Sequence, residues 1–191
     1  MLTVTEAISR LTAAAARPTE MESVLVTNSL GRILATDITS PISVPPADNS
    51  AMDGYTIALD HNQTTQANQS FEVVDRIAAG STGNDLKKGC AARIFTGAPI
   101  PKGANTVVMQ EECKLSEDSS KISVERALNL NENIRALGND MLESDVILCS
   151  GIQIKPQDIS LAASVGVGEL KVFKKIKVGV VFTGDELVGP G

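Results

Sequence analysis

Apolar and polar residues follow a helical rhythm near the start of this chain. A set of apolar side chains recurs there at intervals of three to four residues: Val4, Ile8 and Leu11. They follow Thr3 and Glu6, whose spacing is that of a capping box. The pattern predicts an opening amphipathic helix that ends near Arg17, because the proline after it disfavours the helical conformation.

The middle of the chain has a different rhythm, with short apolar runs cut by glycine and proline. Over residues 71–124 this predicts a small β-domain with tight turns. The strand candidates in it are residues 73–74, 91–95, 106–110 and 121–124. Further strands are predicted at residues 23–27, 33–38, 55–59, 146–148 and 152–154. The polar residues 117–120 predict the tip of a hairpin.

The last third of the chain predicts a second helix and then a buried strand. Pro156 occupies the first turn of the predicted helix 156–165, and glycines follow its end. Residues 176–182 are apolar without alternation, which is typical of a strand buried on both faces in a parallel sheet. Such a strand needs neighbours, so we expect this chain to be the N-terminal portion of a longer protein whose next domain is α/β.

Composition narrows the possible functions. The chain has 191 residues, 42% of them hydrophobic and 21% charged, which predicts a folded protein. Its net charge of -6 and the lack of a basic run argue against a nucleic-acid surface or an anionic membrane as partner. The sequence also has neither a signal-peptide pattern nor a long apolar stretch, and its three cysteines are widely spaced. We therefore expect a cytoplasmic protein with reduced thiols.

The first segment with candidate chemistry is residues 45–55. It holds Asp48 and Asp53, with Asn49 and Ser50 between them. Such hard oxygen ligands could hold a hydrated divalent cation. The alternative is an ordered turn in which Asp and Asn side chains accept hydrogen bonds from nearby backbone N–H groups.

Three more segments offer polar groups for a ligand. Thr96 and Gly97 lie in a turn that could receive an anion, or that simply reverses the chain. Arg135 could pair with phosphate while Asp140 faces a metal, or could form a surface salt bridge. Residues 183–186 follow the predicted parallel strand, at the edge where open α/β sheets bind their ligands.

Taken in order, these four segments resemble the MoeA family, the molybdopterin molybdenumtransferases, which include the E domain of gephyrin. The residues DNSAMDGY at 48–55, TGAP at 96–99 and TGDEL at 183–187 look like three hallmark motifs of the family. The apolar segments 31–35 and 107–111 fit as well. The resemblance therefore covers nearly the whole chain.

The resemblance implies a mixed α/β, multidomain fold with a β-rich, barrel-like middle domain inserted in a small α/β domain. The implied boundaries are an N-terminal helix at 1–17, a discontinuous linking domain at 18–47 and 141–173, the β-rich domain at 48–140, and the first strand of a truncated molybdopterin-binding α/β domain at 174–191. It also implies a homodimer, with the active cleft between the α/β domain of one subunit and the β-rich domain of the other. The opening helix would pack on that α/β domain.

The activity that the resemblance implies is insertion of molybdate into adenylated molybdopterin, with Mg²⁺ as cofactor and release of AMP. The implied catalytic residues are Asp53, Thr96 and Asp140. The resemblance also implies that Ser50, Gly97, Arg135, Thr183 and Gly184 bind the cofactor and that Asp185 and Glu186 bind the metal. A molybdopterin-adenylating protein or domain would act upstream, and we expect no turnover from this chain alone.

A second function stays open beside the enzyme. The family pattern usually has glutamate where this chain has Asn139, and serine where it has Phe182. These departures motivate the alternative of a dimerising scaffold or binding module of the gephyrin type, without catalysis.

Overall fold

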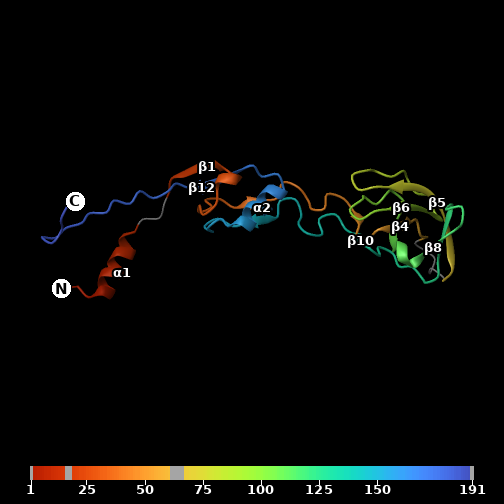
Figure 1. Ribbon diagram of the computed structural model, residues 1–191, viewed down its shortest axis with the longest axis horizontal. Coiled ribbons are helices and arrows are strands. Elements are labelled where there is room, and N and C mark those ends of the chain that lie inside the picture. Colours follow the sequence, from red (N-terminus) through yellow and green to blue (C-terminus); the bar gives the residue numbers. More distant parts are fainter. Residues whose placement is uncertain (1, 16–18, 61–66, 190–191) are drawn as a thin grey trace. The chain divides into compact units, whose positions relative to one another are not determined.

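The computed structural model describes residues 2–15, 19–60 and 67–189 (Figure 1). The chain forms two compact units, Met1–Thr39 with Val146–Gly191 and Ser40–Asp145. The fold is mixed α/β and rich in strands. Among the described residues, no helix has the length and apolar character that crossing a membrane requires.

The first unit contains two helices and two pairs of strands. In chain order its elements are α1 (Val4–Ala14), β1 (Met21–Leu25), η1 (Val26–Asn28), β2 (Ile38–Thr39), β11 (Val146–Leu148), α2 (Pro156–Ser164) and β12 (Glu169–Phe173). β1 pairs antiparallel with β12, and β2 with β11. Its core is formed by Val26, Leu34, Leu148, Ile154, Ala162, Leu170 and Val172.

Both predicted helices are confirmed. The capping box of α1 is present: the Thr3 N–H donates to the Glu6 carboxylate at 2.8 Å and the Glu6 N–H donates to the Thr3 hydroxyl at 3.3 Å. The predicted end at Arg17 lies outside the described residues. α2 starts with Pro156 in its first turn, and Gly166 follows its end with φ 84°.

In this unit one strand is missing from the sequence predictions, and two predicted strands are not formed. β12 was not predicted, although it buries Leu170 and Val172 in alternation. Only the last residue of the predicted strand 33–38 belongs to a strand, and of residues 152–154 only Gln153 forms an isolated bridge, with Ile33. Short apolar runs like these also suit irregular segments packed on a core, so their sequence does not specify a ladder.

The predicted strand over residues 176–182 is absent as well. This segment is irregular, and Val178, Val181 and Phe182 are each at least three-quarters exposed. Within the described residues no second strand pairs with it. Apolar side chains favour a strand only when a neighbouring strand takes its backbone hydrogen bonds and other elements cover its faces.

The second unit is built on one six-stranded sheet. Its elements are β3 (Asn49–Ser50), β4 (Gly54–Ile57), β5 (Gln69–Ile77), β6 (Cys90–Ile94), β7 (Thr106–Met109), η2 (Gln110–Glu112), β8 (Cys113–Leu115), β9 (Lys121–Val124) and β10 (Ile134–Arg135). The sheet has the order β7-β4-β6-β5-β9-β8, and its pairs are antiparallel except β5 with β6. The predicted strands 91–95, 106–110 and 121–124 and the hairpin tip at 117–120 are confirmed.

The connection between β7 and β8 shows that this sheet is curled. A flat sheet of six strands would separate its two edge strands by about 24 Å. The edges are joined only by the three residues of η2, and a chain from Met109 to Cys113 reaches about 14 Å at most. The sheet therefore bends into a half-barrel, with no β7–β8 ladder among the described residues.

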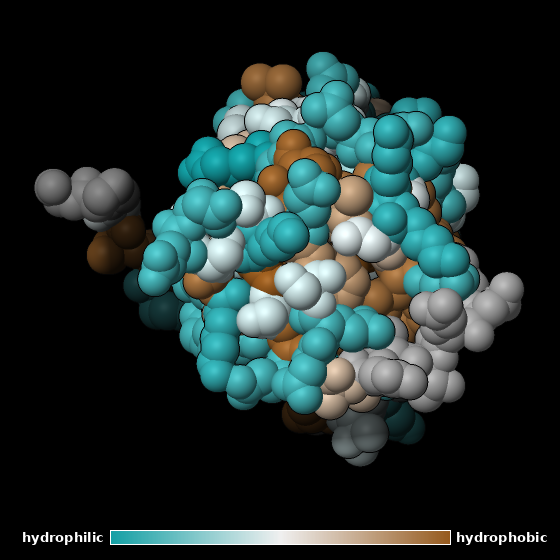
Figure 2. Space-filling view, turned by 90° about the vertical axis from the view of Figure 1, so that its right-hand side faces the viewer, coloured by the Kyte–Doolittle hydropathy of each residue, from teal (hydrophilic) through white to brown (hydrophobic). Residues whose placement is uncertain are grey.

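Both faces of the half-barrel carry apolar side chains. Neighbouring residues such as Ala91 and Ala92, or Val107 and Val108, belong to two different core clusters because side chains alternate along a strand. Figure 2 shows one face of the second unit, where hydrophilic residues cover most of the surface and apolar ones show between them near its centre.

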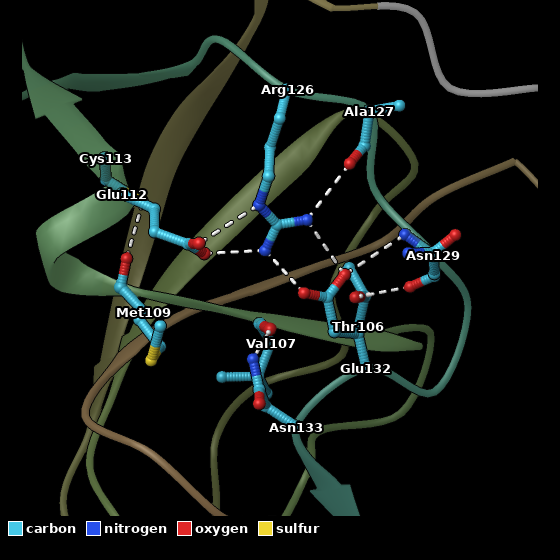
Figure 3. A network of polar contacts seen from close by, with 10 residues as sticks. All are labelled: Thr106, Val107, Met109, Glu112, Cys113, Arg126, Ala127, Asn129, Glu132 and Asn133. Carbon is cyan, nitrogen blue, oxygen red and sulfur yellow. Dashed lines mark hydrogen bonds and ion pairs between the residues drawn. The ribbon is translucent and has the colours of Figure 1, made fainter.

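Arg126 links the turn between the edge strands to the segment that precedes β10 (Figure 3). Its guanidinium donates two hydrogen bonds to the Glu112 carboxylate, at 3.2 and 2.6 Å, and two to that of Glu132. The Glu132 carbonyl in turn accepts from the Val107 N–H at 2.9 Å. This bidentate clamp holds residues 129–133 against β7.

Candidate functional site

Three loops of the second unit, residues 45–54, 95–100 and 133–141, meet through backbone hydrogen bonds. Ser50 and the second loop exchange two of them: its N–H donates to the Ala98 carbonyl at 2.9 Å, and the Gly97 N–H donates to its carbonyl at 2.8 Å. The Ala51 N–H donates to the Asn133 carbonyl at 2.9 Å. Segments more than 40 residues apart in sequence therefore form one surface.

The third loop is fixed along the first by side-chain and backbone contacts. β10 pairs antiparallel with β3, which places Arg135 opposite Asn49. The Leu137 N–H donates to the Asp48 carboxylate at 2.8 Å, and the Asp140 N–H donates to the Val44 carbonyl at 2.9 Å. Asp48 thus serves the ordered-turn role that the sequence left open.

Asp53 and Thr96 form a polar pair on this surface. One oxygen of the Asp53 carboxylate, Oδ1, accepts from both the N–H and the hydroxyl of Thr96, at 2.8 and 2.7 Å. Within the described residues, Oδ2 accepts no hydrogen bond. Both residues are exposed, so one carboxylate oxygen is held in place while the other can meet a ligand.

The surroundings keep Asp53 ionised. The hydrogen bonds from the Thr96 backbone and hydroxyl lower the pKa of its carboxyl, and the nearby charge of Arg93 lowers it further. At neutral pH the Asp53 side chain is therefore a carboxylate. It can bind a cation or accept a proton, and it is not a proton donor.

Gly54 lets the first loop run close against β7. A Cβ atom on this residue would lie 1.9 Å from the Val108 carbonyl oxygen, which no side chain allows. The Gln110 N–H donates to the Asp53 carbonyl at 3.1 Å, immediately beyond β7. The glycine thus fixes where the carboxylate of its neighbour Asp53 stands on the sheet.

Two of the predicted cofactor-binding residues have their polar groups engaged inside the protein. The Ser50 side chain is buried and its hydroxyl donates to the Met52 carbonyl at 2.6 Å. Gly97 adopts φ 81°, and its N–H is used by Ser50. The N–H groups of Thr96 and Ala98 are likewise taken, so these three amides of the turn are not free to receive an anion.

The other predicted residues of this unit lie on its exposed side. Arg135 is exposed in β10, and Asp140 is exposed with its Oδ1 accepting from the Asn139 side-chain amide at 3.1 Å. Among the described residues, no hydrogen bond joins Asp140 to Asp53 or Thr96. The structure therefore brings Asp53 and Thr96 into contact, and it holds the loop of Asp140 against the first loop.

The residues Thr183, Gly184, Asp185 and Glu186 belong to the other unit and form an exposed turn there. The Leu187 N–H donates to the Gly184 carbonyl at 3.2 Å. Gly184 has φ 151°, and a Cβ atom on it would lie 2.3 Å from a Glu186 carboxylate oxygen. The Glu186 side chain thus folds back over the glycine, beside Asp185.

Magnesium would have to take part of its shell from outside the protein. Within the described part of the chain, no three His, Cys, Asp or Glu side chains lie close enough together to hold a metal ion. Mg²⁺ commonly uses only one or two protein carboxylates and completes its octahedron with water and phosphate oxygens. The exposed neighbours Asp185 and Glu186 fit that donor set.

The sequence analysis does not single out Arg93, whose guanidinium contacts residues next to Asp53 and at the end of β7. Its guanidinium donates to the Gly54 carbonyl at 3.2 Å and to the Gln110 side chain. It also stacks over the rings of Tyr55 and Phe95, at 5.1 and 4.9 Å from their centroids. The signal was available, since side-chain alternation along β6 places residues 93 and 95 on one face.

Comparison with known proteins agrees with the motif order. Residues 2–166 match the family described as the MoeA N-terminal region, domains I and II. The whole chain is 40% identical over 192 residues to the molybdopterin molybdenumtransferase of Haemophilus influenzae and covers 46% of it. The chain thus spans less than half the length of this relative.

Two solved structures of the molybdopterin biosynthesis MoeA protein from Pyrococcus horikoshii have a similar fold. One has a TM-score of 0.74 at 32% sequence identity, covering 80% of this chain and 41% of the solved one. The other has a TM-score of 0.77 at 27% identity, covering 92% of this chain and 45% of the solved one. With the family match over most of its length, the chain belongs to the MoeA family, of which it carries the N-terminal region.

Proposed function

We propose that the complete protein inserts molybdate into adenylated molybdopterin, with Mg²⁺ as cofactor and with release of AMP. The observation that carries this proposal is the Asp53–Thr96 pair, held where the three loops meet. In this proposal the complete protein is a cytoplasmic homodimer, and it acts after a molybdopterin-adenylating protein or domain.

In this proposal Asp53 acts as a fixed anion. Thr96 holds one carboxylate oxygen through two hydrogen bonds, so the free oxygen keeps a defined direction without ordering the side chain during the reaction. Because the pKa of Asp53 is lowered, the carboxylate is charged throughout the neutral range. It can therefore orient a ligand cation or accept a proton from the substrate.

The exposed residues divide the remaining work. Arg135 offers a guanidinium to the substrate's phosphate oxygens, and Asp140 adds a second carboxylate to the same loop surface. Asp185 and Glu186 would hold Mg²⁺ in the turn that Thr183 and Gly184 begin. When bound, the ion would neutralise charge on the phosphate groups.

The central test is the Asp53→Asn variant of the full-length protein. Its amide oxygen can still accept from Thr96, so the loop should keep its shape while the negative charge is lost. We expect most molybdenum insertion to disappear in a reconstituted assay, with an unchanged circular dichroism spectrum. The matched control is Asp85→Asn, an exposed aspartate that forms an ion pair with Lys102 at 3.6 Å.

Unchanged cofactor yield from Asp53→Asn would remove the enzymatic assignment and favour the scaffold alternative. We also expect the 191-residue chain alone to show no turnover, because residues of the cleft would come from parts of the protein beyond it. Molybdenum insertion by this chain alone would contradict the proposed division of the site.

A further inference from the structure

We propose that Arg76, Phe95 and Arg93 form a binding platform for a diphosphate group, beside Asp53 and Thr96. This inference rests on the proposed function, because it names the part of the adenylated substrate that the second unit holds. Arg76 lies in β5 and Arg93 in the neighbouring strand β6, and Phe95 follows β6 directly.

In this platform the Phe95 ring contacts the guanidinium groups of both arginines. The guanidinium of Arg76 lies 4.8 Å from the centroid of the Phe95 ring, and that of Arg93 lies 4.9 Å from the same centroid. The two guanidinium groups are therefore no more than about 10 Å apart. Arg76 and Arg93 are also register partners in the parallel pair β5–β6, so their side chains leave the sheet on one face.

The two arginines differ in how much of their hydrogen-bonding capacity is used. Arg93 donates to the Gly54 carbonyl and to Gln110, which fixes its position. Arg76 is exposed, and in the described part of the chain its guanidinium has neither a hydrogen bond nor an ion pair, only the ring contact. Its planar fork therefore keeps five N–H donors free, in a geometry that suits phosphate oxygens.

The charges around the platform also set the two arginines apart. Asp53 and Glu111 lie near Arg93. Hydrogen bonds from Thr96 lower the pKa of Asp53 most and one from the Gln110 side chain lowers that of Glu111 most, and the charge of Arg93 lowers both further. Asp75 precedes Arg76, but its carboxylate accepts from the backbone N–H groups of Arg76 and Asn84. Among the described residues the guanidinium of Arg76 has no carboxylate partner, and a bound anion would supply one.

A diphosphate fits this arrangement better than a single phosphate. Each of the two phosphoryl groups can contact one guanidinium. The two negative charges then offset the repulsion between the two positive charges. Phe95 is followed directly by Thr96, so an anion on the platform would place the rest of its molecule next to the Asp53 carboxylate. The diphosphate linkage of an adenylated substrate has this chemistry.

The test is a titration of this chain with inorganic pyrophosphate at low salt, without divalent cations. Arginine Nε–H signals and backbone amides of ¹⁵N-labelled protein are followed by NMR. We expect saturable shifts at Arg76, Arg93 and the Thr96 amide. Arg76→Gln should weaken pyrophosphate binding about tenfold, since a charge-assisted contact is lost. The matched control Arg10→Gln, an exposed arginine of α1, should leave it unchanged.

Several outcomes overturn the proposal. They are shifts spread over many lysines and arginines without saturation, equal affinity for inorganic phosphate and pyrophosphate, or unchanged affinity in Arg76→Gln. In the full-length enzyme, Arg76→Gln should raise KM for the adenylated substrate and leave kcat unchanged. If Asp53→Asn keeps full activity while pyrophosphate still binds at Arg76, the proposed function fails and the anion platform is supported.

Discussion

Arg126 offers the sharpest test of how the half-barrel is held together. It clamps Glu112 of η2 and Glu132 of the segment before β10, the two pieces that flank the open side of the sheet (Figure 3). A double-mutant cycle with Arg126→Met and Glu132→Gln isolates one arm of this clamp from its other contacts.

The expected magnitude follows from partial burial. The side chains of Arg126 and Glu132 are 35% and 22% exposed, between a surface pair and a buried one. Exposed pairs contribute about 0.2–1 kcal/mol, while breaking a buried pair costs about 3–5 kcal/mol. Solvent screening of the arginine pulls the value toward the lower end, so we expect a coupling of about 1 kcal/mol.

The coupling should depend on pH in one direction. Burial raises the pKa of Glu132, but the hydrogen bonds and charge of Arg126 outweigh it, and the net pKa is lowered. A carboxyl with a lowered folded pKa stabilises fully above its unfolded pKa of about 4.3, and that stability is lost as pH falls through the folded value. The coupling should therefore be present at pH 7 and should fall as the pH is lowered below about 4.3.

Urea unfolding followed by tyrosine fluorescence suits this measurement. The sequence has one tyrosine and no tryptophan, and Tyr55 lies in the core of the second unit, so the signal reports that unit. A coupling of zero at pH 7, or one that does not fall as the pH is lowered below about 4.3, would refute the reasoning.

Two further predictions concern packing and thiol chemistry. Gly54→Ala should destabilise the second unit by about 3 kcal/mol in the same urea assay, because its Cβ would meet the Val108 carbonyl oxygen. Gly168 lies in the first unit with open space around it, so Gly168→Ala should change little in the unfolding of that unit followed by circular dichroism. A thiol reagent at pH 8 should modify the exposed Cys149 well before Cys113, whose pKa burial raises to about 11; equal rates, measured by mass spectrometry of the labelled peptides, would contradict this.

The sequence predicts correctly those elements whose structure depends only on residues close together in the chain. The capping box of α1 and the proline at the start of α2 act within one helical turn, so they specify helix starts without any distant partner. The hairpin tip at residues 117–120 is equally local, with the Asp118 carboxylate accepting from Ser116 and Ser120. Such features can be predicted from a short stretch of sequence.

The candidate site shows the opposite case. The ordered motifs pointed to Asp53 and Thr96 as chemical groups, but their contact joins residues 43 positions apart. Alternation along β6 indicates that Arg93 and Phe95 share a face, but the groups that Arg93 contacts depend on the register of β6 against its neighbours. The first loop also supplies the acceptors for the Thr96 and Gly97 amides, and the sequence of the turn itself does not encode these partners.

By itself, the sequence determined the two helices, several strands of the middle region, and the family to which the motifs belong. Only the tertiary structure decided the curl of the six-stranded sheet, the meeting of the three loops, and the stack of two arginines on Phe95. The physical reason is the range of the interactions involved. Caps and turns close within a few residues, whereas strand register and side-chain clusters form only after distant segments pair.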